Sequence, residues 1–264
     1  MASDRAAQHV VTQQELADLE ASRTFTNLRF EAAVALDDFD FDDARFDSCV
    51  FAIPSIRGAS FSGAKFANCR FEPARFASCK FAGAEFSGCT MFDAQHKKGL
   101  ALAFCDLQGV EFAKCNLATA SFERCDLYNV HAVDSSFRGA QFGHSTFSKP
   151  LSRRAVITKA TFERCNLAFA DLSGLSLPNT EFLSCRFSEA SFIDTDLSGA
   201  SMLKCTMDRA EWDRAKLGNA DLQGSELSGL NLTVLAEYAG MIVSDTEQSQ
   251  LLQQLGIEIR RSTK

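Results

Sequence analysis

Ten cysteines and four histidines are the residues of this 264-residue chain best suited to chemistry. Cysteines can bind soft metals, act as nucleophiles or pair as disulfides. A metal site needs such side chains gathered around one open position. The cysteines instead recur every ten or twenty residues within three groups, and the histidines share no register with them: they are His9, His96, His131 and His144. We therefore expect neither a metal nor a cofactor.

Catalysis by other side chains is equally poorly supported. The serines and aspartates are too scattered to nominate a nucleophile with its base and orienting group, and no glycine-rich phosphate loop is present. The sequence predicts a protein that is not an enzyme. The cysteines are interpreted as small buried hydrophobic side chains, with their thiols reduced.

A large hydrophobic residue recurs every five residues along most of the chain. The register runs from Phe41 to Met91 and resumes, one residue out of frame, from Leu102 to Leu232. It holds 18 of the 24 phenylalanines. We call each such position a central residue. The position two residues earlier carries small residues and includes all ten cysteines.

A period of five excludes both a regular helix, which repeats every 3.6 residues, and a single continuous strand, which repeats every two. Residues at i−2 and i share one face of an extended segment, so the other three must turn the chain. The ten-residue spacing of many cysteines implies an even number of sides, and four is the smallest even number that encloses a core. The fold class we expect is an all-β solenoid with twenty residues per coil, nine or ten coils and a short α-helix at each end.

Charge and composition limit the classes of partner that we expect the protein to bind. The net charge is −7, and residues 1–50 account for all of it. An acidic balance disfavours direct binding of nucleic acid. We see no signal peptide and no apolar run of membrane-spanning length, so we expect a cytoplasmic protein without a membrane segment.

Two breaks in the repeat predict projecting loops. Cys89 and Cys105 are sixteen residues apart, which is ten plus a six-residue insertion near residues 92–99. A second break near residues 148–155 keeps the frame but carries proline and bases. Loops that interrupt a regular scaffold are often functional. The partner-binding residues we expect in them are Phe92, Asp93, Gln95, His96, Lys97, Lys98, Lys149, Pro150, Leu151, Arg153 and Arg154.

The two ends of the chain predict caps. Thr12 and Glu15 form a capping-box pattern, and Ser244 or Asp245 can cap a second helix with Glu247 or Gln248. We expect an N-terminal helical extension over residues 1–24, the solenoid over 25–232, and a C-terminal cap and dimerisation segment over 233–264. Gly256 is placed to end the second helix.

The repeat, as in Ala170-Asp171-Leu172 and Ala220-Asp221-Leu222, resembles the pentapeptide-repeat family over about 200 residues. That resemblance implies a right-handed quadrilateral β-helix. The two loops and the segment Gln248–Ile257 are similar to those of the Qnr-type quinolone-resistance proteins, which protect DNA gyrase and topoisomerase IV. This resemblance implies the same partners, which the protein would protect against quinolones or, in self-immunity, against a natural gyrase poison. It also implies a homodimer through Leu251, Leu252, Leu255, Ile257 and Ile259. A longer N-terminal part departs from the Qnr pattern.

The resemblance also implies that the rod mimics DNA, with carboxylates along its outer surface. The acidic residues expected to do so lie within residues 171–237 and are Asp171, Glu181, Asp194, Asp196, Asp208, Glu211, Asp213, Asp221 and Glu226. Residues 51–264 are neutral overall, so the charge of the rod does not require it to be a strong mimic of DNA. The alternative is a non-enzymatic scaffold whose loops bind another protein.

Overall fold

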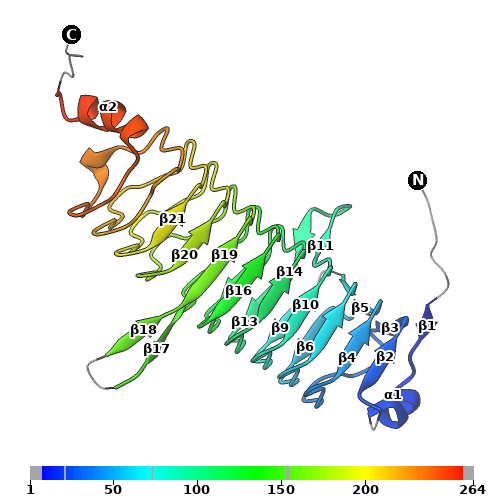
Figure 1. Ribbon diagram of the computed structural model, residues 1–264. Coiled ribbons are helices and arrows are strands. Elements are labelled where there is room, and N and C mark those ends of the chain that lie inside the picture. Colours follow the sequence, from blue (N-terminus) through cyan, green and yellow to red (C-terminus); the bar gives the residue numbers. More distant parts are fainter. Residues whose placement is uncertain (1–7, 21, 73, 153–154, 258–264) are drawn as a thin grey trace.

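The computed structural model describes residues 8–20, 22–72, 74–152 and 155–257. The chain winds into a right-handed, four-sided β-helix of about nine turns, which forms a rod (Figure 1). Helix α1 (Gln13–Glu20) lies at one end of the rod and α2 (Asp245–Gln254) at the other. The expected fold class is confirmed.

Three sides of the rod are parallel sheets, and we number the sides in chain order. Side 1 is a nine-stranded sheet of β2 (Thr24–Thr26), β4 (Arg45–Asp47), β7 (Lys65–Ala67), β10 (Glu85–Ser87), β14 (Glu111–Ala113), β16 (Val130–Val133), β19 (Ala160–Glu163), β20 (Glu181–Leu183) and β21 (Ser201–Leu203). Side 2 begins with β1 (His9–Val10), β3 (Leu28–Glu31), β5 (Val50–Ala52) and β8 (Arg70–Phe71). Side 3 contains β6 (Ser55–Arg57), β9 (Arg75–Ala77), β13 (Ala101–Ala103) and β15 (Ser121–Glu123). Side 4 is joined by single parallel bridges such as Ser60 to Lys80.

Strand pairing gives the length of each coil. Phe46 pairs with Phe66, and Phe66 with Phe86, so neighbouring coils are 20 residues apart. The interval is 26 residues from Phe86 to Phe112 and 30 residues from Ala132 to Phe162. Twenty residues per coil and a six-residue first insertion are confirmed, and the second insertion is ten residues long, which explains why it keeps the frame.

The core consists of four columns of central residues, one for each side. Within a column the phenylalanine rings stack face to face: the ring centroids are 4.9 Å apart for Phe46 and Phe66 and 4.6 Å for Phe66 and Phe86. Between columns the rings meet edge to face, as in Phe46 and Phe51. A flat ring suits the ~4.8 Å spacing of hydrogen-bonded strands, which accounts for the preference for phenylalanine.

The corners between sides require a left-handed backbone. The residue two positions after most central residues has a positive φ, such as 56° at Ser48 and 67° at Gly63. Glycine and asparagine adopt this conformation most readily. Most other residues at the corners are short or polar. The two aromatic exceptions are Phe104 and Phe169.

The cysteine thiols lie inside the rod in two ladders, on sides 2 and 4, and all ten are buried. Their burial was predicted, but their hydrogen bonding was not. Cys69 Sγ donates to the Phe46 carbonyl at 3.4 Å, and Ser135 Oγ, at the equivalent position, donates to the Phe112 carbonyl at 3.2 Å. The neighbouring Cys185 thiol and burial raise the pKa of Cys165, so this thiol stays protonated.

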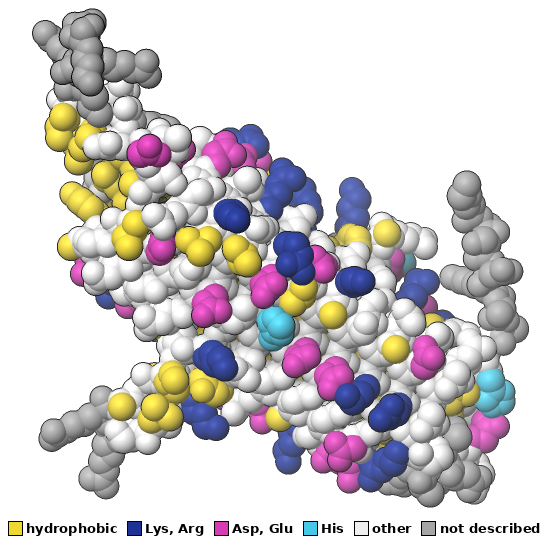
Figure 2. Space-filling view, in the orientation of Figure 1, with side chains coloured by type: hydrophobic (Ala, Val, Ile, Leu, Met, Phe, Trp, Pro, Cys, Tyr) yellow, Lys and Arg dark blue, Asp and Glu magenta, His cyan; other side chains and the backbone are white. Residues whose placement is uncertain are grey.

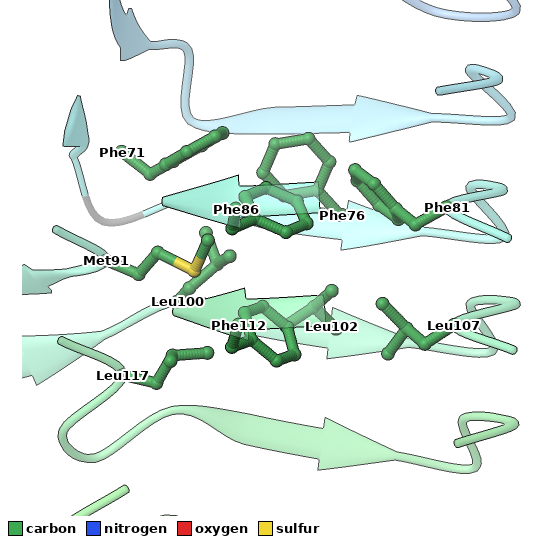
Figure 3. Close-up of a pocket in the computed structure, with 10 residues that line it drawn as sticks. All are labelled: Phe71, Phe76, Phe81, Phe86, Met91, Leu100, Leu102, Leu107, Phe112 and Leu117. Atoms are coloured by element: carbon green, nitrogen blue, oxygen red, sulfur yellow. The ribbon is translucent and has the colours of Figure 1, made fainter. Parts of the chain in front are cut away.

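The phenylalanine columns are partly interrupted at the first insertion, although Phe86 still stacks on Phe112 with ring centroids 5.2 Å apart. The coil with Phe71, Phe76, Phe81 and Phe86 is followed by one that supplies mainly leucine, methionine and a single phenylalanine (Figure 3). An apolar cavity of about 10 Å³ lies between these coils. Its residues are Phe71, Phe76, Phe81, Phe86, Met91, Leu100, Leu102, Leu107, Phe112 and Leu117. Smaller side chains stacked on flat rings leave this gap.

The helices at the two ends differ in how they are capped. Thr12 Oγ1 accepts from the Glu15 N–H, and Glu15 Oε2 accepts from the Thr12 N–H, so the predicted N-terminal capping box is present. The capping box predicted at α2 was wrong: Ser244 is the N-cap residue, but its hydroxyl accepts from the Gly224 N–H instead. Gly256, with φ of 75°, follows α2 as expected.

Candidate protein-protein interface

The first insertion is a short hairpin of β11 (Phe92–Asp93) and β12 (Lys98–Gly99) that projects from the corner between sides 2 and 3 (Figure 1). Asp93 orders its tip, because Asp93 Oδ1 accepts from the Gln95 N–H at 2.8 Å and Oδ2 lies 2.6 Å from His96 Nδ1. The hydrogen bond from His96 holds the pKa of Asp93 below its usual value. Phe92 is half-buried, whereas the tip residues Gln95, His96, Lys97 and Lys98 are exposed.

Gly99 fits this hairpin onto the rod. A Cβ at Gly99 would lie 2.5 Å from the Ala118 carbonyl oxygen of the next coil, so a larger residue would push the strand away. An open depression lies between the hairpin and the rod, lined by Ala52, Pro54, Glu72, Asp93, His96 and Lys98. The expected loop is therefore a defined, mostly polar projection.

The second insertion is a longer hairpin of β17 (Ser148–Pro150) and β18 (Val156–Thr158), and β18 leads directly into β19 of side 1. It leaves the rod at the corner between sides 4 and 1, diagonally opposite the first hairpin (Figure 1). Lys149 Nζ lies 5.7 Å from the centre of the Tyr128 ring, which anchors the base. Arg153 and Arg154 lie outside the described residues.

The outer part of the second hairpin is apolar. Leu151 is 67% exposed and Val156 68% exposed, and Ile157 and Pro150 are also exposed. Figure 2 shows hydrophobic side chains gathered on this projection. Sequence reasoning included Leu151 and Pro150 in the candidate site but left out Val156 and Ile157, two adjacent β-branched residues of the kind that favours a strand. Large exposed apolar side chains are costly unless a partner covers them.

The nine acidic residues of the proposed DNA-mimic surface all point outward, but they are distributed over all four sides. Three of them also hold the coil in shape: Asp171, Asp196 and Asp221 each accept, through Oδ1, from the N–H two residues later at 3.0 Å. Asn116 and Asn166 make the same contact at 3.1 Å. The aspartate or asparagine before a central residue is thus first a turn residue.

Ion pairs neutralise part of this acidic surface. Asp194 Oδ2 lies 2.6 Å from Arg214 Nη2, and that hydrogen bond lowers the pKa of Asp194. Asp196 lies 3.8 Å from Lys216. Asp208 lies 3.7 Å from Arg209, which also contacts Glu189. Six of the nine acidic residues form no ion pair with any residue the structure describes: Asp171, Glu181, Glu211, Asp213, Asp221 and Glu226.

The C-terminal end of the rod exposes an apolar surface. Leu251 is only 6% exposed because it packs on the chain's own core, so it has little surface left for a second copy. Leu252 is half-buried, Leu255 and Ile257 are exposed, and Ile259 lies outside the described residues.

Coil pairing continues beyond Leu232 at this end, because Lys216 bridges to Glu237 and Asp221 to Ile242. Sequence reasoning therefore missed Tyr238 and Ile242, which this last coil exposes. The hydrophobic pattern of residues 234–243 was the available signal. The apolar end of the rod comprises Tyr238, Ile242, Leu252, Leu255 and Ile257.

Two phenylalanines sit at corner positions with their rings exposed. Phe104 has φ of 56° and is 55% exposed, and Phe169 has φ of 61° and is 43% exposed. An arginine covers part of each ring: Arg124 lies 5.7 Å from the centre of Phe104, and Arg138 lies 4.1 Å from the centre of Phe169. These cation–π contacts explain how bulky side chains are accommodated on the surface.

Two kinds of feature are absent from the described part of the chain: a cluster of metal-ligating side chains and a membrane-spanning helix. Among residues 8–20, 22–72, 74–152 and 155–257, no group of three histidine, cysteine or acidic side chains could hold a metal ion. Neither described α-helix is long and apolar enough to cross a membrane.

Comparisons with known proteins agree with the repeat. Family models described as pentapeptide repeats match residues 55–91 and 105–143, and one described as a pentapeptide repeat region matches residues 155–232. Together these matches cover more than half of the chain. Comparison with curated protein sequences found no match.

Solved structures of QnrB1, described as a plasmid-mediated fluoroquinolone resistance protein, share the fold. The full-length form is 24% identical, with a TM-score of 0.64 over 89% of this chain and 99% of QnrB1. A trypsin-treated form is also 24% identical, with a TM-score of 0.64 over 86% of this chain and 99% of that one. A second trypsin-treated form is 23% identical, with a TM-score of 0.63 over 90% of this chain and all of that one.

Proposed function

The chain belongs to the pentapeptide-repeat family, and on that premise we propose that it binds a type II topoisomerase and protects it from poisons. The partner is DNA gyrase, with topoisomerase IV as a second enzyme of the same class. The poison is a quinolone or a natural gyrase-targeting toxin. The protein acts by binding alone, without catalysis.

One observation carries this proposal: a rigid rod with two hairpins at diagonally opposite corners and an apolar end, in a fold that spans QnrB1 almost completely. A rod of stacked coils presents a long, straight surface of fixed width, as duplex DNA does. Exposed carboxylates such as Glu181, Glu211 and Asp213 give part of that surface the charge of a phosphate backbone.

The charge supports recognition more than tight binding. Because Asp194, Asp196 and Asp208 are paired with bases, the remaining carboxylates mainly favour the rate of encounter and the orientation of the rod. The apolar hairpin residues Leu151 and Val156 supply side chains that can be buried against the enzyme.

A homodimer through the apolar end of the rod completes the proposal. Leu252 from α2, Leu255 and Ile257 from the segment after it, and Tyr238 and Ile242 from the last coil would be covered by the same surface of a second copy. Such a dimer would place two rods end to end. It would also cover the end of the core, which a solenoid must protect from water and from edge pairing.

The test is a supercoiling and DNA-cleavage assay with purified gyrase, a quinolone and increasing amounts of the protein. We expect supercoiling to recover and cleaved DNA to decrease as the protein approaches the enzyme concentration. The same titration without drug shows whether the protein itself inhibits the enzyme. A folded rod that changes neither reaction with gyrase or topoisomerase IV would contradict the proposal.

A second candidate is a scaffold that binds a different protein. It is favoured by the even balance of acids and bases in residues 51–264. The same assay separates the two candidates, since a scaffold for another partner has no effect on supercoiling.

A further inference from the structure

Side 1 carries a row of apolar side chains that the core does not need. The residue after each central residue points outward, and along side 1 this position holds Ala113, Val133, Glu163, Leu183 and Leu203 in successive coils. Glu163 separates Val133 from the two leucines, and we call Leu183 and Leu203 the apolar stripe. Leu183 is 37% exposed, and Leu203 is partly exposed.

A stable coil does not require hydrophobic residues in this row. Elsewhere on side 1 the same position holds Asp47, Ser87 and Gln223, and the coil geometry there is the same. A shallow depression follows the stripe, lined by Thr161, Glu163, Glu181, Phe182, Leu183, Ser201 and Leu203. The leucines are thus exposed beside a groove where polar residues would serve equally well.

The stripe runs between two rows that carry charged side chains. The row before the central residues holds Glu111, Glu181 and Asp221, which form no ion pair with described residues. The row at the corner on the other side holds Lys114, Asp134, Arg164, Ser184 and Lys204 in successive coils. Arg164 is paired with Asp134 and Glu163, whereas Lys204 forms no ion pair with a described residue. Around Leu183 and Leu203 the surface therefore has Glu181 and Asp221 on one edge, apolar side chains in the middle and Lys204 on the other edge.

The spacing of this surface suits one kind of partner. Successive coils place stripe residues ~4.8 Å apart along the rod. An α-helix lying along the rod presents a side chain to it once per turn, about 5.4 Å apart. Over the two coils of Leu183 and Leu203 the mismatch is well under 1 Å. An extended strand would instead face the groove every second residue, roughly 6.6 Å apart, and would lose register faster.

We propose that the apolar stripe of side 1 binds an amphipathic α-helix of the topoisomerase. The helix carries apolar residues three and four positions apart, with basic residues along the edge that meets Glu181 and Asp221 and acidic residues along the edge that meets Lys204. The second hairpin lies beside this site, because β18 continues into β19. This inference rests on the proposed function for the identity of the partner.

The experiment measures binding of purified gyrase to the full-length protein and to L183Q/L203Q. Both substitutions place glutamine where Gln223 already stands in the same row, so the coil should fold normally, which circular dichroism checks. The matched control is Ile193→Gln, the outward residue after a central residue on side 3. Removing two partly buried leucines from an interface should weaken binding about tenfold or more, and the control should bind like the unmodified protein.

A photo-crosslinking residue at position 203 tests the kind of partner. Mass spectrometry of the cross-linked gyrase should map the attachment to one helix, at positions three or four residues apart. Equal binding by L183Q/L203Q and the unmodified protein would overturn the inference while leaving the proposed function intact. Cross-links confined to a loop or strand would do the same. If the unmodified protein itself fails to bind gyrase, the proposed function fails, and the assignment of this helix to gyrase fails with it.

Discussion

Replacing Asp171, Asp196 and Asp221 together separates the two roles of these carboxylates. Each accepts from a backbone N–H at 3.0 Å and also contributes one negative charge. Asparagine keeps the accepting oxygen, as Asn116, Asn166 and Asn231 do at equivalent positions. The triple Asn variant therefore changes the charge from −7 to −4 without removing a turn contact.

The triple Ala variant has the same charge but loses all three hydrogen bonds. A single hydrogen bond contributes about 0.5–1.5 kcal/mol to stability, so three contribute about 2–4 kcal/mol. For a chain of this size a loss of 1 kcal/mol lowers Tm by about 2–4 °C. We expect the Asn variant to melt within about 2 °C of the unmodified protein, and the Ala variant about 5–15 °C lower.

The assay uses fluorescence of Trp212, the single tryptophan, which is buried and stacks on Phe192 at 4.4 Å. Far-UV circular dichroism of the same samples reports the whole rod. For function, we expect the Asn variant to associate with gyrase more slowly and with a weaker dependence on salt. If the Asn variant melts as low as the Ala variant, the coil depends on the carboxylate charge, and our reading of the turn is refuted.

Three further predictions concern the hairpins, the ends and the thiols. Deleting Asp93–Lys98 should restore the 20-residue interval between coils, leaving the circular dichroism spectrum unchanged but reducing protection of gyrase; full protection would exclude the first hairpin from the mechanism. The substitutions Leu252→Asp and Leu255→Asp should each give monomers in analytical ultracentrifugation, while Leu183→Asp, far from the apolar end, should not; a dimer that survives both would refute the C-terminal interface. A disulfide reagent such as DTNB should label none of the ten buried thiols in the native protein within the time that labels all ten in denaturant; rapid native labelling would show that the rod opens readily.

The solenoid could be predicted because every coil repeats the same contacts. Phe46, Phe66 and Phe86 occupy equivalent positions in successive coils, so the same pattern recurs many times along the sequence. A single small residue at this position, such as Ala132, does not obscure the repeat. The number of sides followed from the cysteine spacing. The length of the first insertion is also visible in the shift of register, whereas the second insertion keeps the frame, and its ten residues are seen only in the strand pairing.

The site was less predictable because its residues occur once. Nothing in the sequence distinguishes the Asp171 carboxylate as a turn acceptor from a free surface charge; that depends on the backbone N–H of Ser173. Ser244 has the composition of a helix cap, but the Gly224 N–H of the neighbouring coil competes for its hydroxyl. Leu251 lies in α2 and Leu255 directly after it, and only the position of the last coil decides that Leu251 is buried and Leu255 exposed.

The fixed interval between coils makes the rod a molecular ruler. Each coil touches only its two neighbours, so adding or removing twenty residues would change the distance between the second hairpin and the apolar end by one step of ~4.8 Å and leave both intact. Lineages could therefore match the rod to enzymes of different size by duplicating a coil. The backbone hydrogen bonds between coils set the length of each step, whereas the two hairpins occupy fixed positions along the rod.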